Sequence, residues 1–561
     1  MTSEHLPAEA SPASSPSPQS LAPVPLPRAA GEESASVGAR HASRVRAVGI
    51  VSLAALFVLL LDAQWVKIDD FGMSNDLRNK PLGSVLADIV TTRTTPHVRF
   101  AFLHHLVLLA FFRLGETSRT TVNLLYLFMT GIMFAGGLWL ARPLARRPLL
   151  WGAAWLAFAG VAVSIPIRTT LEFKTATYLL LCFAMCAGLV AIAWRFLESE
   201  VAPPVRRQWL WCLLAIGCMH TAEVSLFAVA CVGFALALQR RLRRALLLAT
   251  LGWPLLYWGA NKLLFPRPMN LLENSSSHKL PLVVRHTVKV LWGAWGPELV
   301  LALVLVLATA AVALWRARTG ERLLAVLSAL GMGGALMCSG IGVLFLANAN
   351  FLAVAERHIA FAGLCLVGSA LACAGLLVRQ GVSGWGAVLL AVALAGVGGW
   401  GVQVRLPALL SYADARRQEL ADTFFVQAYV KAEAAAMHDR GESKELLVFI
   451  PRWHVYSSRN DYLDPSFMGA SWTLKEFARG FSCPPKRACA SVTYLPNLSD
   501  GLQTKLDRPQ QLALCGRMRN GRVLVLRTSV AEEPPPPELP TGFSDEQCLA
   551  WLEAGKLVTP G

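Results

Sequence analysis

Two neighbouring aspartates, Asp69 and Asp70, are the side chains whose type and position best suit chemistry. They lie a few residues past the end of the first apolar run, between Trp65 and Phe71. Asp62 lies inside the last turns of that run, and a carboxylate at membrane depth is costly, so the acidic residues here are functional candidates by default. The alternative is that the pair is merely solvated at the membrane surface.

Arg357 and His358 form a second candidate, at the start of an apolar run late in the chain. An arginine at this depth can hold a phosphate through two parallel hydrogen bonds. Pairing with Glu356, or extension of the side chain to the lipid surface, is the structural alternative.

Further basic side chains occupy two segments that we expect on the same side of the membrane. Arg99 lies close to His97, His104 and His105 in the first segment, and 264–296 contains a larger set. These groups could bind a phosphate, and anchoring to lipid headgroups is the alternative. The basic and imidazole residues of the second segment are Arg267, His278, Lys279, Arg285, His286 and Lys289.

His220 and Glu223 interrupt the apolar stretch 209–238, which we interpret as a hairpin of two short helices. Their spacing places them on one helix face or on either side of a break. Buried polar groups must be paired. The pair therefore predicts either a hydrogen bond between helices or a place in an active site.

The composition indicates which elements must position these groups. Of the 561 residues, 54% are hydrophobic and only 16% are charged, whereas soluble globular proteins carry about 25% charged residues. We therefore predict an all-α polytopic membrane protein, in which each span needs about 20 apolar residues. The eleven predicted spans are 47–66, 120–141, 149–167, 175–195, 209–221, 222–238, 245–263, 297–315, 323–347, 357–378 and 384–402.

The net charge of +16 does not indicate nucleic-acid binding. Nearly all of the excess lies in the apolar block 47–402, because residues 1–46 are neutral and 403–561 are nearly so. Basic residues between apolar spans mark the cytoplasmic side of a membrane protein. With a cytoplasmic N-terminus, every arginine-rich turn lies inside, and the outside segments are 67–100, 168–174, 264–296, 348–356 and 403–561.

Three domains follow from this pattern. Residues 1–46, rich in proline and serine, predict a disordered cytoplasmic tail, and 47–402 form the transmembrane domain. Residues 403–561 predict an extracytoplasmic α/β domain with a helix over 408–438 and strands at 445–451 and 522–528. Its four cysteines suggest two disulfides rather than a zinc site. They are Cys483, Cys489, Cys515 and Cys548.

The order of several segments along the chain indicates a family resemblance. The acidic outside loop 67–100 ends before the apolar run "FAFLHHLVLLAFFRLGE", and a span then closes with "LARPLARR". The histidine-containing hairpin follows, and "AERHIAFAGLCLV" opens a late span. Over residues 47–402 this order resembles the GT-C superfamily of integral membrane glycosyltransferases, which includes the protein O-mannosyltransferases and the lipid A aminoarabinose transferase.

The resemblance implies transfer of a hexosyl or pentosyl group from a polyprenyl-phosphate-linked donor on the outer face of the cytoplasmic membrane. The acceptor would be a glycan, a lipid or a protein. Asp69 or Asp70 would be the catalytic base or would hold a divalent metal, Mg²⁺ or Mn²⁺. Arg357 matches the donor-phosphate position best. The weaker matches are Lys279, Arg285 and Arg99 for the phosphate and His220, Glu223 and His358 in supporting roles.

Two departures from the family pattern leave a non-catalytic relative open. The segment after Arg357 is "HIAF" rather than "YLLP"-like, and the first loop carries Asp-Asp rather than Asp-Glu. A polysaccharide polymerase or ligase is disfavoured, since no outside loop within the spans is large. A transporter or flippase is the non-enzyme alternative, although no internal repeat is evident. A membrane protein with an extracytoplasmic sensing domain is another.

Overall fold

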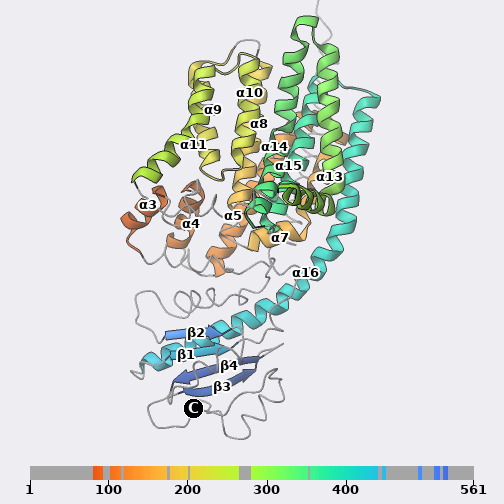
Figure 1. Cartoon of the computed structure of the whole chain (residues 1–561). Coiled ribbons are helices and arrows are strands. Elements are labelled where there is room, and N and C mark those ends of the chain that lie inside the picture. The colour runs from red at the N-terminus through yellow and green to blue at the C-terminus, as the bar shows by residue number, and fades with distance from the viewer. Residues whose placement is uncertain are drawn as a thin grey trace, which may run out of the picture.

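The chain forms a helical bundle followed by a small sheet in the computed structural model (Figure 1). The residues that the structure describes are 80–91, 102–114, 119–172, 177–199, 202–264, 280–351, 354, 356–439, 445–449, 491–495, 511–517 and 522–528.

Helices occupy the predicted apolar segments. In chain order they are α3 (Leu82–Val90), α4 (Phe102–Leu114), α5 (Arg119–Ala141), η1 (Arg142–Arg146), α6 (Pro148–Ala162), α7 (Ile165–Glu172), α8 (Tyr178–Glu198), α9 (Val205–Met219), α10 (Ser225–Leu238), α11 (Arg244–Leu264), α13 (Leu280–Arg316), η4 (Thr319–Glu321), α14 (Arg322–Phe351), α15 (Glu356–Arg379) and α16 (Trp385–Asp439).

Six helices of the described part are long and apolar enough to cross a membrane, or seven spans if the bent pair α6–α7 counts as one. These helices support the predicted class, an all-α membrane protein. Helix α10 and the apolar part of α11 are shorter, and the predicted first span 47–66 lies outside the described residues. The total of eleven spans therefore stays a prediction.

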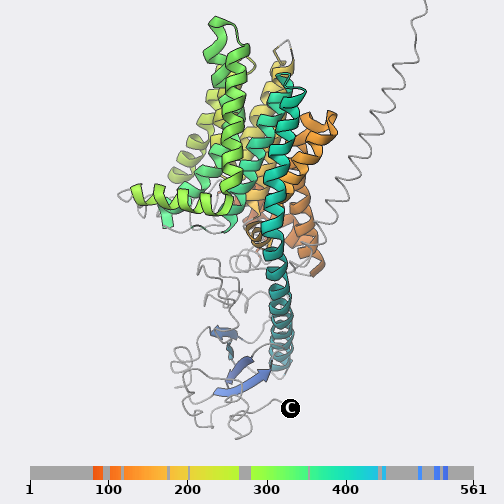
Figure 2. The ribbon, with the colours of Figure 1, turned by 90° about the vertical axis from the view of Figure 1, so that its right-hand side faces the viewer.

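One predicted straight segment is bent, and another belongs to a helix that begins earlier than predicted. Helices α6 and α7 meet at 69°, because Pro166 lacks the N–H group that would continue the helical hydrogen bonding. Helix α13 begins at Leu280, well before the predicted start at 297, and kinks at Trp295 just before Pro297. Its first half lies across the bundle, as Figure 2 shows.

Helix α16 differs most from the prediction, which separated a span at 384–402 from a tail helix at 408–438. One helix of 55 residues covers both, with Pro407 inside it. At about 1.5 Å per residue it is roughly 80 Å long. It leads from the bundle toward the sheet (Figures 1 and 2).

The sheet has four strands in the order β2–β1–β4–β3. β1 pairs parallel with β2 and antiparallel with β4, and β3 pairs antiparallel with β4. Two strands lie where the sequence predicts them, at 445–451 and 522–528. The strands are β1 (Glu445–Phe449), β2 (Ser491–Leu495), β3 (Gln511–Arg517) and β4 (Arg522–Thr528).

Hydrogen bonds between turns bring the arginine-rich segments to one end of the bundle. Arg147 Nη1 donates to the Val382 carbonyl at 2.8 Å and so joins the turn after η1 to the turn after α15. The backbone N–H of Arg243, after α10, donates to Gln208 Oε1 in α9 at 3.0 Å. In Figure 1 the α13–α14 and α15–α16 turns lie at this same end, away from the sheet. We call it the arginine end.

The most extensive contact between described helices is that of α6 with α16. Glycines allow their backbones to touch: a Cβ added at Gly398 would lie 2.3 Å from the Leu156 carbonyl oxygen. Such small-residue contacts are the usual way that membrane helices approach closely.

We predict that Gly398→Ala separates α6 from α16 and lowers the stability of the folded chain by about 1–3 kcal/mol. Gly396→Ala is the matched control, because a Cβ at Gly396 meets nothing within 4 Å. Thermal unfolding of the two variants in detergent measures the difference. Equal melting temperatures for both variants would contradict the close packing.

Candidate functional site

Polar side chains gather at the end of the bundle opposite the arginine end. This polar end contains α3, α4, α7, the first half of α13, the end of α14 and the start of α15 (Figure 1). Several of its polar groups are held by side chains from other helices.

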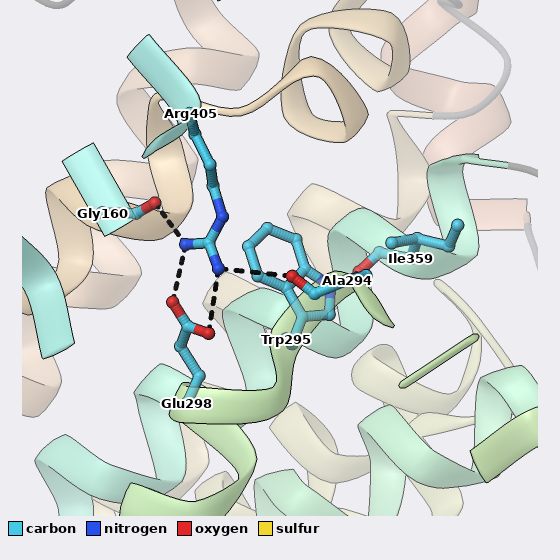
Figure 3. A network of polar contacts seen from close by, with 6 residues as sticks. All are labelled: Gly160, Ala294, Trp295, Glu298, Ile359 and Arg405. Atoms are coloured by element: carbon cyan, nitrogen blue, oxygen red, sulfur yellow. Dashed lines mark hydrogen bonds and ion pairs between the residues drawn. The ribbon is translucent and has the colours of Figure 1, made fainter. Parts of the chain in front are cut away.

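A buried ion pair joins α16 to α13 (Figure 3). Arg405 donates to both carboxylate oxygens of Glu298, at 2.6 and 3.0 Å. It also donates to the Gly160 carbonyl at 2.7 Å and to the Ala294 carbonyl at 3.2 Å. Glu298 is only 2% exposed, so this bidentate geometry and the two extra acceptors are what make the buried charges tolerable.

Trp295, the residue at the kink of α13, connects this ion pair to α15. The Arg405 guanidinium lies 4.4 Å from the centre of the Trp295 ring, within the range of a cation–π interaction. The indole Nε1 donates to the Ile359 carbonyl at 2.8 Å, as Figure 3 also shows. The kink, α16 and the first turn of α15 are therefore fixed as one unit, which includes the position of Arg357.

Arg357 lies in the first turn of α15, half-buried, and its Nε atom is enclosed without a hydrogen-bond acceptor. Within the described part of the chain its side chain makes no hydrogen bond or ion pair. An enclosed polar atom without a partner costs about 1–3 kcal/mol. Such a group is expected where a ligand supplies the missing acceptor.

A short hydrogen-bond chain orders His286 in the transverse half of α13. Its Nδ1–H donates to Asn348 Oδ1 at 2.6 Å, and the Asn348 amide donates to Thr287 Oγ1 at 2.9 Å. Asn348 is fully buried near the end of α14. With Nδ1 occupied, Nε2 is the ring nitrogen left to exchange a proton or contact a ligand.

His220 lies in the turn between α9 and α10 and is 2% exposed. Trp253 Nε1 donates to His220 Nε2 at 2.7 Å, so Nε2 carries no proton. The Tyr257 ring packs edge-on against the imidazole at 4.6 Å between centres, and its hydroxyl donates to the Val90 carbonyl at 2.6 Å. Of the two roles predicted for His220, these contacts favour the hydrogen bond between helices.

Two further groups complete the polar end. His104 in α4 lies 3.3 Å from Thr177 Oγ1 at the start of α8. Arg168 in α7 is fully buried, and its neighbour Thr169 donates to the Tyr412 hydroxyl at 3.4 Å. A buried guanidinium in a short helix at the membrane end is a strong functional signal.

Two of the predicted phosphate-binding residues lie in the described part of the chain, and they differ in exposure: Arg357 is half-buried and Arg285 is exposed. Arg285 is exposed on the transverse half of α13, beside exposed Val284 and Val288. This arrangement favours the headgroup contact that the sequence left as its alternative. His358 is half-buried next to Arg357, and Glu223 is exposed, so it does not share the buried setting of His220.

Other predicted residues lie outside the described part of the chain. They include Asp69, Asp70, Arg99 and Lys279, and of the tail cysteines only the backbone of Cys515, in β3, is described. Their roles stay predictions. The eight cysteines of the apolar helices are free thiols. Within the described residues, no three His, Cys, Asp or Glu side chains gather as metal ligands.

Two charged residues of the polar end were not singled out in the sequence. Arg168 stands in a short hydrophilic segment, "RTTLEFK", and Arg405 follows a predicted span end. The available signal was the cost of an arginine beside an apolar run, which makes each one a candidate.

Comparison of the chain with known protein families, with curated proteins and with solved structures finds no match in any of the three.

We predict that Glu298→Ala lowers the free energy of unfolding by about 3–5 kcal/mol, because it leaves the Arg405 charge buried and unpaired. The double variant with Arg405→Ala should be less destabilised than the sum of the single variants. Glu321→Ala, an exposed glutamate in η4, is the control with no expected change. Additive losses in chemical denaturation would show that the two side chains act independently.

Proposed function

We propose that the chain is an integral membrane glycosyltransferase that uses a polyprenyl-phosphate-linked sugar. The acceptor is a glycan, a lipid or a protein at the outer face of the cytoplasmic membrane. The observation that carries the proposal is the enclosed, partnerless Nε of Arg357, positioned at the polar end of the bundle. The order of segments that resembles the GT-C superfamily supports it.

In this proposal Arg357 binds the donor phosphate, which leaves as the glycosidic bond to the anomeric carbon breaks. Two parallel hydrogen bonds from a guanidinium suit phosphate oxygens and stabilise the negative charge that develops on them. Asp69 or Asp70 accepts the proton of the acceptor hydroxyl or amine as it attacks. Attack from the face opposite the phosphate gives inversion.

The Trp295 contact gives this arrangement a rigid base. The Trp295 Nε1 hydrogen bond to Ile359 holds the first turn of α15, and the buried Arg405–Glu298 pair holds Trp295. A binding group on such an element loses little conformational freedom when the donor binds. Such rigid support is expected for a residue that binds a charged leaving group.

We predict that Arg357→Ala lowers sugar transfer roughly tenfold to hundredfold, the value of a charge-assisted hydrogen bond or two. Arg357→Lys should retain part of the activity, since one ammonium replaces a bidentate fork. The measurement is incorporation of labelled sugar into envelope glycans, lipids and proteins in cells, normalised to the amount of folded enzyme. Arg244→Ala, at an exposed basic position at the start of α11, is the control.

Asp69→Asn and Asp70→Asn in the same assay test the carboxylate base. At least one of them should abolish transfer while the protein reaches the membrane in normal amount. Normal transfer by both variants would remove the carboxylate mechanism. Equal activity of Arg357→Ala and Arg244→Ala would remove the phosphate role of Arg357.

The proposed orientation has its own test, because the polar end must face outward. We predict that a phosphatase reporter fused after Gly561 is active outside the cytoplasm, and that the same reporter inserted between Arg318 and Thr319 is not. The reason is the excess of arginine at the second position. A cytoplasmic C-terminus would place the polar end on the wrong side for an external donor.

A further inference from the structure

A cavity of about 810 Å³ opens at the arginine end, between α5, η1, α8, α9 and α15. Five guanidinium groups line it against one carboxylate. The charged residues of the lining are Arg142, Arg146, Arg147, Arg195, Arg379 and Glu198. It lies at the opposite end of the bundle from Arg357, so it is separate from the proposed transfer site.

Three of these arginines are free to meet a ligand. Arg379 pairs with Glu198 and lies over the Trp194 ring at 5.3 Å, and Arg147 donates to the Val382 carbonyl. The other three make no side-chain hydrogen bond or ion pair within the described part of the chain. They are Arg142, Arg146 and Arg195.

Orientation in the membrane does not explain this cluster. Arginines that only mark the cytoplasmic side need not line a common cavity. Arg206 and Arg207 of α9 are an example, because both are exposed and neither lines this cavity. Guanidinium groups that line the same cavity repel one another. An anion bound in the cavity offsets this repulsion.

The rest of the lining indicates the form of the anion. Trp139, Met185 and Leu214 give the cavity an apolar side. Trp139 is 46% exposed on α5, and on α9 the neighbouring Leu213 is 59% exposed, on faces suited to lipid. A ligand that fits both sides carries a phosphate next to a hydrocarbon chain.

We propose that this cavity binds the phosphate of an anionic phospholipid, held by Arg142, Arg146 and Arg195, with the acyl chain along α5 and α9. Arginine forks match phosphate oxygens bidentately. Basic pockets between membrane helices are known to take such headgroups. The chemistry recognised is the phosphate group, which a soluble phosphate could also supply.

The test measures the melting temperature of the full-length protein in detergent during titration with phosphatidic acid, phosphatidylcholine or inorganic phosphate. A ligand that binds the folded state raises this temperature, and the rise grows with the logarithm of the ligand concentration relative to its dissociation constant. The double variant Arg146→Gln/Arg195→Gln should bind phosphatidic acid roughly tenfold more weakly or worse. Arg206→Gln/Arg207→Gln removes the same charge from the same end outside the cavity and should bind like the unaltered chain.

Stabilisation by phosphatidic acid that only the cavity variant loses supports the proposal. A second outcome is that inorganic phosphate stabilises the protein to the same extent, with the effect lost in the cavity variant. That result would show that the cavity binds a phosphate group and would overturn the proposal that a lipid carries it. Equal weakening in both double variants, or equal stabilisation by phosphatidylcholine, overturns the site itself, because binding would then follow net charge or lipid in general.

Discussion

The buried ion pair of Arg405 and Glu298 is the constraint on which the bundle depends. Two charges in an apolar interior are tolerable only with full hydrogen bonding, and the fold supplies it from three helices. Gly160 lies in the last turn of α6, where helical carbonyls lack partners, and Ala294 directly precedes the kink of α13. Arg405 uses both carbonyls, so the end of α6, the kink of α13 and the middle of α16 must meet at one point.

That meeting point explains features that otherwise look unrelated. The close glycine contact of α6 with α16 brings the Gly160 carbonyl within reach of the guanidinium, since a Cβ at Gly401 would collide with both. The kink at Trp295 turns the first half of α13 across the bundle and aims the indole at α15. The position of Arg357 therefore follows from an interaction more than 40 residues away in sequence.

The sequence predicts helix positions well, because an apolar run of membrane length has few alternatives to a helix. It predicts bends and joins poorly. The predicted span 149–167 includes Pro166, although two helices meet there at 69°. The predicted span 384–402 ends before Arg405, although the helix continues and a buried glutamate pairs with that arginine. The sequence does not identify Arg168 and Arg405 for the same reason: whether a charge near an apolar run is solvated or paired depends on residues distant in the chain.

The two ends of the bundle use charge in different ways, and this difference bears on function. At the polar end, the buried ion pair, His286 and His220 have hydrogen-bond partners on neighbouring helices, and the enclosed Nε of Arg357 has no acceptor among the described residues. At the arginine end, cations outnumber acceptors around an open cavity. An excess of cations around a cavity that lipid can reach suits the headgroup of an anionic lipid. An enclosed donor within a fixed framework suits a single phosphate, as the proposed transfer would require.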